Sequence, residues 1–373
     1  MLSLLTSKCE DVQSNWIQSL FVVNGNVTRP VDLSDFFAHY YFPKLQHIRF
    51  IRCAISSWDL LKSRTGALTE LWLNFVDPLP TPTTLQLLSI LGSNPLLQEV
   101  TLLRRAIPND HVNTSPFRVP LHYILCLCLS GDSQCVFKLL QQLDYPATLY
   151  WLSLKLQDCT EANVSQIIGL HLQSHLQHCG RSPCGLELSL SSNEIYFGIS
   201  NVDGMDVLSA EVNEVVRLRI QLDQSPPKDL LGKLALDLIA YIPQEEIIYF
   251  KGHSETVSMG NICTWLLNLQ MLFFSDITLP TTFPVLNLSK NEGIPLSLQS
   301  LALQHLTVSD NDWGPLTTFL ACLESSGKRL NMLMVFGSDH MCSEVVKGIE
   351  GMVQEFSTDG MDSWCPSCIC PEP

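Results

Sequence analysis

Residues 68–102 have the sequence LTELWLNFVDPLPTPTTLQLLSILGSNPLLQEVTL and contain one complete structural unit. The stretch opens with the pattern L-x-x-L-x-L at Leu68, crosses a proline-rich turn, and continues into an apolar-periodic run from Thr83 to Leu91. After a turn at 92–95, a similar pattern, L-x-x-V-x-L, starts at Leu97. Alternating apolar residues predict a strand, and apolar residues spaced three or four apart predict a helix. The unit is therefore a strand, a helix and the next strand.

The six-residue pattern of this unit recurs along most of the chain. Its first residue lies at or near positions 45, 68, 97, 122, 149, 183, 215, 245, 269, 298 and 330, a mean spacing of about 28.5 residues. Such a spacing is typical of the longer leucine-rich repeats, in which each strand is followed by a helix. The sequence therefore predicts an α/β fold, a leucine-rich-repeat solenoid (horseshoe) with parallel strands on the concave face and helices outside.

We expect three parts in the chain. Residues 1–40 are predicted to form a helical flank or cap, residues 41–356 an array of about eleven irregular repeats, and residues 357–373 a flexible cysteine-containing tail. The flank is predicted to be helical over 9–22, with a second short helix within 32–41. Helices between strands are expected over 132–143, 161–179, 228–241, 259–269, 315–323 and 341–356. Residues 191–214 are less regular and form either an irregular repeat or an insertion.

Composition narrows the range of functions. The net charge of −15 opposes nonspecific binding to nucleic acids and to anionic membranes, so we expect neither partner. Neither a long apolar segment nor a signal-peptide pattern is found, which predicts a cytoplasmic or nuclear protein. The 14 cysteines are then best interpreted as reduced, buried thiols that act as small apolar side chains.

In a leucine-rich repeat the residues that alternate with the leucine anchors point outward on the concave face. Tryptophan, phenylalanine and arginine are enriched in protein interfaces, because they supply large contact area or forked hydrogen-bond donors. The predicted partner-binding residues are Arg49, Trp72, Trp151, Arg217, Arg219 and Phe273. The alternative is that these side chains pack against neighbouring strands and loops, or that the arginines pair with the many carboxylates.

Two clusters have the residue types of metal sites. His171, His175 and His178 lie one helical turn apart beside Cys179, and Cys184 follows. The competing interpretation is a polar helix face, because Leu172 and Leu176 alternate with the histidines. The tail pattern C-x-x-C-x-C at Cys365, Cys368 and Cys370 lacks a fourth zinc ligand. We therefore expect neither metal nor cofactor, and keep a metal-dependent enzyme using the histidines as an alternative.

Enzyme motifs are absent from the sequence. It contains no G-x-S-x-G, no G-x-x-x-x-G-K-[ST], no G-x-G-x-x-G and no H-E-x-x-H. The sequence therefore predicts a protein without catalytic activity.

Four segments resemble one known family. They are CAISSW at 53–58, the stretch 80–102, SLALQHLTVSDN at 300–311 and EVVKGIEGMVQEF at 344–356. Together they make residues 40–356 similar to the F-box and leucine-rich-repeat-like proteins of mushroom-forming fungi. The resemblance implies a repeat array that holds a substrate, behind an F-box that recruits the Skp adaptor of a cullin-type ubiquitin ligase. The F-box pattern L-P-x-E-[LI]-L does not occur in residues 1–41.

The primary prediction is therefore a non-catalytic, protein-binding leucine-rich-repeat scaffold. The alternative from the resemblance is a ubiquitin-ligase substrate receptor whose F-box is degenerate or missing from this sequence.

Overall fold

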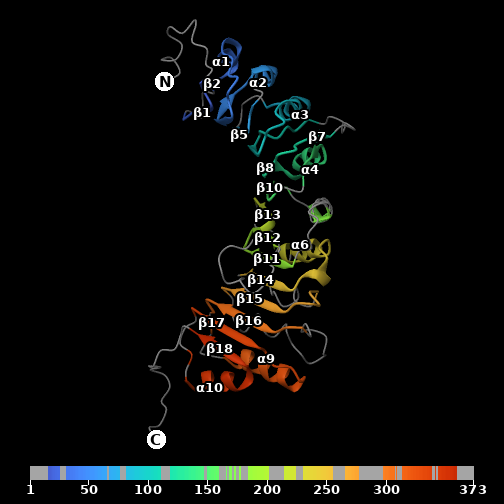
Figure 1. Ribbon diagram of the computed structural model, residues 1–373. Helices are drawn as coiled ribbons and strands as arrows, with labels where there is room; N and C mark the ends of the chain where they lie inside the picture. The colour runs from blue at the N-terminus through green and yellow to red at the C-terminus, as the bar shows by residue number, and fades with distance from the viewer. Residues whose placement is uncertain are drawn as a thin grey trace. The chain divides into compact units, whose positions relative to one another are not determined.

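The computed structural model describes residues 16–25, 31–64, 67–75, 81–110, 118–146, 149–158, 165, 168–169, 172–173, 176–177, 184–200, 214–223, 230–254, 265–276, 297–306, 308, 313–337, 341 and 343–358 (Figure 1). The chain divides into two compact units, Met1–Cys159 and Thr160–Pro373. No helix of the described residues is long and apolar enough to cross a membrane.

The described sheet of the first unit is built from parallel strands in chain order. The order is β1-β3-β5-β6-β8-β10, with bounds β1 Ser19–Val23, β3 His47–Ile51, β5 Glu70–Phe75, β6 Glu99–Arg104, β8 Cys126–Asp132 and β10 Trp151–Gln157. Each neighbouring pair is parallel. The predicted leucine-rich-repeat fold is confirmed here: each of the anchor patterns at 45, 68, 97, 122 and 149 gives one strand.

Helices and short strands connect these parallel strands. Their bounds are β2 Val31–Asp32, α1 Ser34–His39, β4 Cys53–Ala54, α2 Trp58–Arg64, α3 Thr84–Ser93, β7 Val119–Pro120, α4 Ser133–Gln141 and β9 Leu143–Asp144. Helix α3 begins with a capping box, in which Thr83 and Gln86 bond reciprocally to each other's backbone N–H. Helix α4 begins after Asp132, which caps it by accepting hydrogen bonds from the N–H groups of Gln134 and Cys135.

The sheet of the second unit contains one reversal. Its order is β13-β12-β11-β14-β15-β16-β17-β18, with bounds β11 Gly185–Leu190, β12 Glu194–Ser200, β13 Glu214–Leu222, β14 Tyr249–Ser254, β15 Met271–Ser275, β16 Ser300–Gln304, β17 Met332–Phe336 and β18 Glu355–Thr358. Strand β12 is antiparallel to both β11 and β13, whereas β11 and β14 pair in parallel. The irregular stretch 191–214 thus contains a strand of the sheet, and β14 neighbours β11 rather than β13.

The helices of the second unit lie between its later strands. Those with described bounds are α6 Leu230–Ile239, the 3-10 helix Gln244–Glu246, α9 Gly314–Ser325 and α10 Ser343–Met352. The helices predicted over 228–241 and 315–323 are confirmed by α6 and α9.

Three expected helical boundaries are wrong. Residues 19–23 form strand β1 rather than the end of a helix over 9–22, and residues 9–15 lie outside the described part. Residues 265–269 are turns and coil, whereas a helix was expected over 259–269. The last helix ends at Met352, and Glu355–Thr358 pairs with β17. At β1 and β18, pairing with the neighbouring strands β3 and β17 outweighs a local helical pattern.

The core follows from the alternation along each strand. In β5, Leu71, Leu73 and Phe75 are fully buried, whereas Glu70, Trp72 and Asn74 between them are half-buried. Equivalent anchors in the other strands are buried with the apolar faces of the helices. The opposite side of each sheet, here called the open face, carries the half-buried alternating residues.

A left-handed residue ends many of the strands. Arg52, Arg104, Asp158, Asp276 and His305 all have φ between 50° and 59°, and Gly337 has φ +59°. The backbone N–H groups of Arg52, Asp276 and His305 still donate to the neighbouring strand, at 2.8, 3.0 and 2.9 Å. These left-handed residues therefore redirect the chain without losing the hydrogen bond between strands.

Gly337 is expected to be intolerant of a side chain. A Cβ at this position would lie 2.6 Å from His305 Nδ1, in addition to the positive φ. We expect Gly337→Ala to lower the free energy of unfolding by about 2–3 kcal/mol. Gly327→Ala is the matched control, because Gly327 has φ +74° with nothing within 4 Å, so it should lose only about 1 kcal/mol. Urea unfolding measures both, and equal losses would contradict the His305 contact.

Candidate functional site

The structure places the six predicted binding residues on the open faces, all of them half-buried. Arg49 and Trp72 are direct neighbours on β3 and β5, and Trp151 lies further along the same sheet on β10. In the second unit, Arg217 and Arg219 lie on β13 and Phe273 on β15. The sequence predicted only that these residues share a face. The strand order shows that Arg217 and Arg219 on β13 are separated from Phe273 on β15 by three strands.

Met334 alternates with Leu333 and Val335 along β17 and is expected by that alternation to point outward, but it is buried. Met334 is only 5% exposed. Its register neighbours are Ala302 and Ser357, whose short side chains leave room for the flexible thioether to lie against the sheet.

Arg49 is stacked between two aromatic rings. Its Cζ lies 3.0 Å from the ring centroid of Trp72 and 5.6 Å from that of Phe21. The three residues occupy one register row across β1, β3 and β5. Stacking fixes the plane of a guanidinium and removes water from its faces, so its N–H edge is prepared for a planar acceptor such as a carboxylate. Phe21, which is 60% exposed, completes the stack and was missed because its segment was predicted to be a helix.

Polar atoms around this stack are incompletely bonded. Arg49 Nε, Trp72 Nε1 and Asn74 Oδ1 are buried, and none has a hydrogen-bond partner. A buried polar atom without a partner costs about 1–3 kcal/mol. Among the described residues Arg49 also forms no ion pair. The arrangement therefore lowers the stability of the free protein.

Two glutamates lie on the same face, one row away. Glu70 and Glu99 are directly opposite each other on β5 and β6. Like charges at opposed positions on neighbouring strands are unfavourable. Within the described part of the chain neither glutamate forms an ion pair, and His47, the other register neighbour of Glu70, shares a hydrogen bond with Ser19 instead. We call Phe21, Arg49, Glu70, Trp72 and Glu99 the Arg49 surface.

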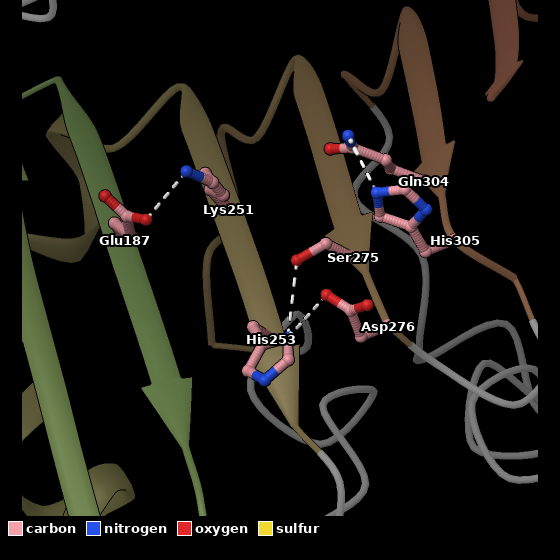
Figure 2. Close-up of polar contacts among 7 residues, drawn as sticks. All are labelled: Glu187, Lys251, His253, Ser275, Asp276, Gln304 and His305. Atoms are coloured by element: carbon pink, nitrogen blue, oxygen red, sulfur yellow. Dashed lines mark hydrogen bonds and ion pairs between the residues drawn. The ribbon is translucent and has the colours of Figure 1, made fainter. Parts of the chain in front are cut away.

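Charges on the open face of the second unit are arranged differently. Lys251 Nζ lies 2.8 Å from Glu187 Oε1, on the neighbouring strand (Figure 2), and Arg219 lies 2.7 Å from Glu194 Oε2. Lys251 also lies 5.7 Å from the Phe273 ring centroid. These described cations are therefore already neutralised by carboxylates of the same sheet, as the alternative interpretation of Arg219 anticipated.

His253, Ser275 and Asp276 contain the residue types of a catalytic triad, but not its geometry. Ser275 Oγ lies 3.4 Å and Asp276 Oδ2 3.2 Å from the same atom, His253 Nδ1 (Figure 2). A triad requires the carboxylate on one imidazole nitrogen and the hydroxyl on the other, so that the ring can take the hydroxyl proton. The contacts instead link β14 to the end of β15 as structural polar contacts.

The residues of the two clusters that were weighed as metal sites fall mostly outside the described part. His171, His175, His178 and Cys179 lie there, as do Cys365, Cys368 and Cys370. Cys184 is described, and its thiol lies 3.7 Å from the Ser200 carbonyl oxygen. The residues that the structure describes contain no group of three or more His, Cys, Asp or Glu side chains that could hold a metal ion.

The six cysteines of the described residues are not in disulfide bonds, and they differ in burial. Cys53 is buried, whereas Cys126, Cys128, Cys135, Cys184 and Cys322 are half-buried. Among these six described cysteines, only Cys53 has the full burial that was expected of the thiols.

Slow alkylation of two thiols is expected. Burial raises the pKa of Cys53 to about 11, and burial together with the Asp132 carboxylate raises the pKa of Cys135 to about 11. At pH 8 each should react with iodoacetamide roughly a hundredfold more slowly than a free cysteine, and about tenfold faster for each added pH unit. Mass-spectrometric peptide mapping measures the rates. A rate equal to that of free cysteine would contradict the assigned environments.

Comparison with known proteins identifies no family for this chain. No family model matches the sequence, and no curated protein matches it. Among solved structures, an internalin (inlF) from Listeria monocytogenes is similar, with 14% identity over 92% of this chain and 80% of that chain and a TM-score of 0.31. The fold class is defined by the repeated strands and their parallel register in this chain.

Proposed function

We propose that this leucine-rich-repeat protein is a non-catalytic scaffold that binds another protein through the Arg49 surface. The observation that carries the proposal is the difference in charge pairing between the two open faces. Arg219 and Lys251 are paired within their own sheet, whereas Arg49, Glu70 and Glu99 form no ion pair with a described residue. The stacked Arg49, which has no ion pair with a described residue, is oriented to form charge-assisted hydrogen bonds, and arginine is one of the residues enriched at interface hot spots.

The surface also defines the chemistry of the partner. A carboxylate that meets the edge of the Arg49 guanidinium can accept two parallel hydrogen bonds. Glu70 and Glu99 favour a Lys or Arg side chain, and alternate residues on one strand face are about 6.6–7 Å apart. The proposed partner is therefore a polypeptide that presents an acidic and a basic side chain about 7 Å apart, with apolar contact to Phe21 and Trp72.

Selection from a random peptide library tests this proposal without knowledge of the natural partner. The wild-type chain should enrich peptides that contain both an acidic and a basic residue. Arg49→Met should lose that enrichment, because methionine keeps the apolar stem but carries no donors. Arg219→Met is the matched control and should select the same peptides as the wild type. Enrichment that is identical for all three chains would contradict the assignment of the surface.

The ubiquitin-ligase role remains a narrower proposal, supported by the resemblance of residues 40–356 to the fungal family. It requires binding of the Skp adaptor through residues 1–41. Of these, residues 16–25 and 31–41 are described and contain strands β1 and β2 and the six-residue helix α1. A pull-down with the adaptor should compare the full chain with chains lacking residues 1–41 or only 1–15, because the larger deletion also removes β1. Absence of adaptor binding by the full chain would reject this role.

A further inference from the structure

A cleft of about 500 Å³ lies within the first unit, where four neighbouring strands end. Phe75, Arg104, Asp132 and Gln157 are the last residues of β5, β6, β8 and β10, and all four line it. The volume is in the range of small-molecule sites. In α/β proteins the carboxyl ends of parallel strands are a frequent place for ligands, because loops and helix N-termini converge there.

Five of the ten residues that line this cleft carry N–H or O–H donors in their side chains. Two of the lining residues are cationic, Arg104 and Arg105, and Thr81, Asn109 and Gln157 are neutral residues with hydrogen-bonding side chains. The remaining lining includes Phe75 and Ile107, which are nearly fully buried and provide apolar surface. This combination of an apolar floor and convergent cationic donors is suited to an organic anion.

The two carboxylates near the cleft, Asp132 and Asp110, accept hydrogen bonds at the first turns of helices. Asp132 Oδ1 accepts hydrogen bonds from Gln134 N at 3.0 Å and Cys135 N at 3.1 Å. Asp110 accepts from the Thr84 N–H at 2.8 Å and from the Thr84 hydroxyl. Both therefore compensate helix N-termini, and neither forms an ion pair with Arg104 in the part of the chain that the structure describes. Arg104 keeps its charge available to a ligand.

We propose that this cleft binds a small organic anion through a carboxylate or phosphate group held by Arg104, with Arg105 as a second cationic lining residue. The site is distinct from the Arg49 surface and does not depend on it. Its ligand is a molecule small enough for 500 Å³, with an apolar part over Phe75 and Ile107 and an anionic group at the arginines.

The left-handed turns of the repeats supply a matched pair of variants. Arg104 has φ 59° at the end of β6, and Arg52 has φ 58° after β3 and does not line the cleft. Glycine favours this conformation, so Arg104→Gly and Arg52→Gly should both fold. Each variant removes one arginine from an equivalent backbone position, but only Arg104→Gly removes a cleft donor.

Isothermal titration of the full chain with citrate and, separately, with inorganic phosphate tests the proposal at constant ionic strength. We expect saturable binding of at least one anion to the wild type and to Arg52→Gly, and at least tenfold weaker binding to Arg104→Gly. A preference between the two anions identifies the group that the cleft takes. Absence of saturation by either anion up to about 10 mM, or equal affinity of all three chains, would overturn the proposal.

Discussion

Replacing Phe274 with alanine should lower the free energy of unfolding of the second unit by about 3–5 kcal/mol. Phe274 is 0% exposed, and its ring lies edge-to-face with Phe250 at a centroid distance of 6.3 Å. Both rings fill the space left by Gly252, where a Cβ would lie 3.0 Å from Phe250 and 3.1 Å from Phe274. Truncation therefore removes a large apolar contact and leaves a cavity that neighbouring side chains cannot fill.

The adjacent phenylalanine provides the control for this prediction. Phe273 is half-buried on the open face, where Lys251 lies near its ring. Phe273→Ala should cost about 1 kcal/mol or less, because it removes one partly exposed cation–π contact. Urea unfolding followed by circular dichroism compares the two variants. A register shifted by one residue would exchange the faces, so a larger loss for Phe273→Ala would contradict the described strand.

Replacing Arg49 with methionine should weaken binding of a selected peptide by about thirtyfold, or about 2 kcal/mol. The variant removes a guanidinium that Trp72 and Phe21 hold in place, and with it the two parallel hydrogen bonds to the partner's carboxylate. Methionine retains apolar contact with Trp72, so the fold should be preserved. Fluorescence anisotropy with the labelled peptide measures the change.

Two further variants test whether binding depends on the planar shape of the Arg49 guanidinium or only on its positive charge. Arg49→Lys keeps the positive charge without the planar fork and should bind with intermediate affinity. Arg219→Met removes a cation that is already paired with Glu194 and should leave the affinity within about twofold. If Arg49→Lys bound as tightly as the wild type, simple charge attraction would replace the bidentate contact.

The fold of the first unit could be predicted from sequence because the alternation within each strand and the pairing of successive strands indicate the same buried face. The pattern at Leu68 fixed which residues of β5 are buried, and the same alternation placed Arg49 and Trp72 outward. Each parallel strand of the first unit also follows its predecessor in chain order. Where every repeat pairs with the next one, the pattern within one unit is sufficient to predict the sheet.

The second unit shows where such reasoning fails. Glu187 and Lys251 form an ion pair because β14 pairs with β11, across two intervening strands of the sequence. Nothing in the residues of β12 alone indicates that it runs antiparallel, since that depends on its partners. The ion pairs that distinguish the two open faces could therefore be identified only once the strand order was known.

The strands at the two ends of the sheet order, β1 and β18, were predicted as helices for a different reason. The spacing of Trp16, Ile17 and Leu20, at and just before β1, predicts a helix. In the structure Ser19–Val23 alternates in exposure as a strand and pairs with β3. A short apolar segment fits both periods, and the tertiary partner decides between them. Phe21, one wall of the Arg49 stack, was lost with this assignment.

Affinity capture from cells that express the protein natively tests the central claim most directly. Quantitative mass spectrometry should compare the wild type with Arg49→Met and Arg219→Met. We expect at least one protein that is captured by the wild type and by Arg219→Met, lost with Arg49→Met, and crosslinked to β3 or β5. Identical captured proteins for all three chains, or crosslinks confined to the second unit, would contradict it.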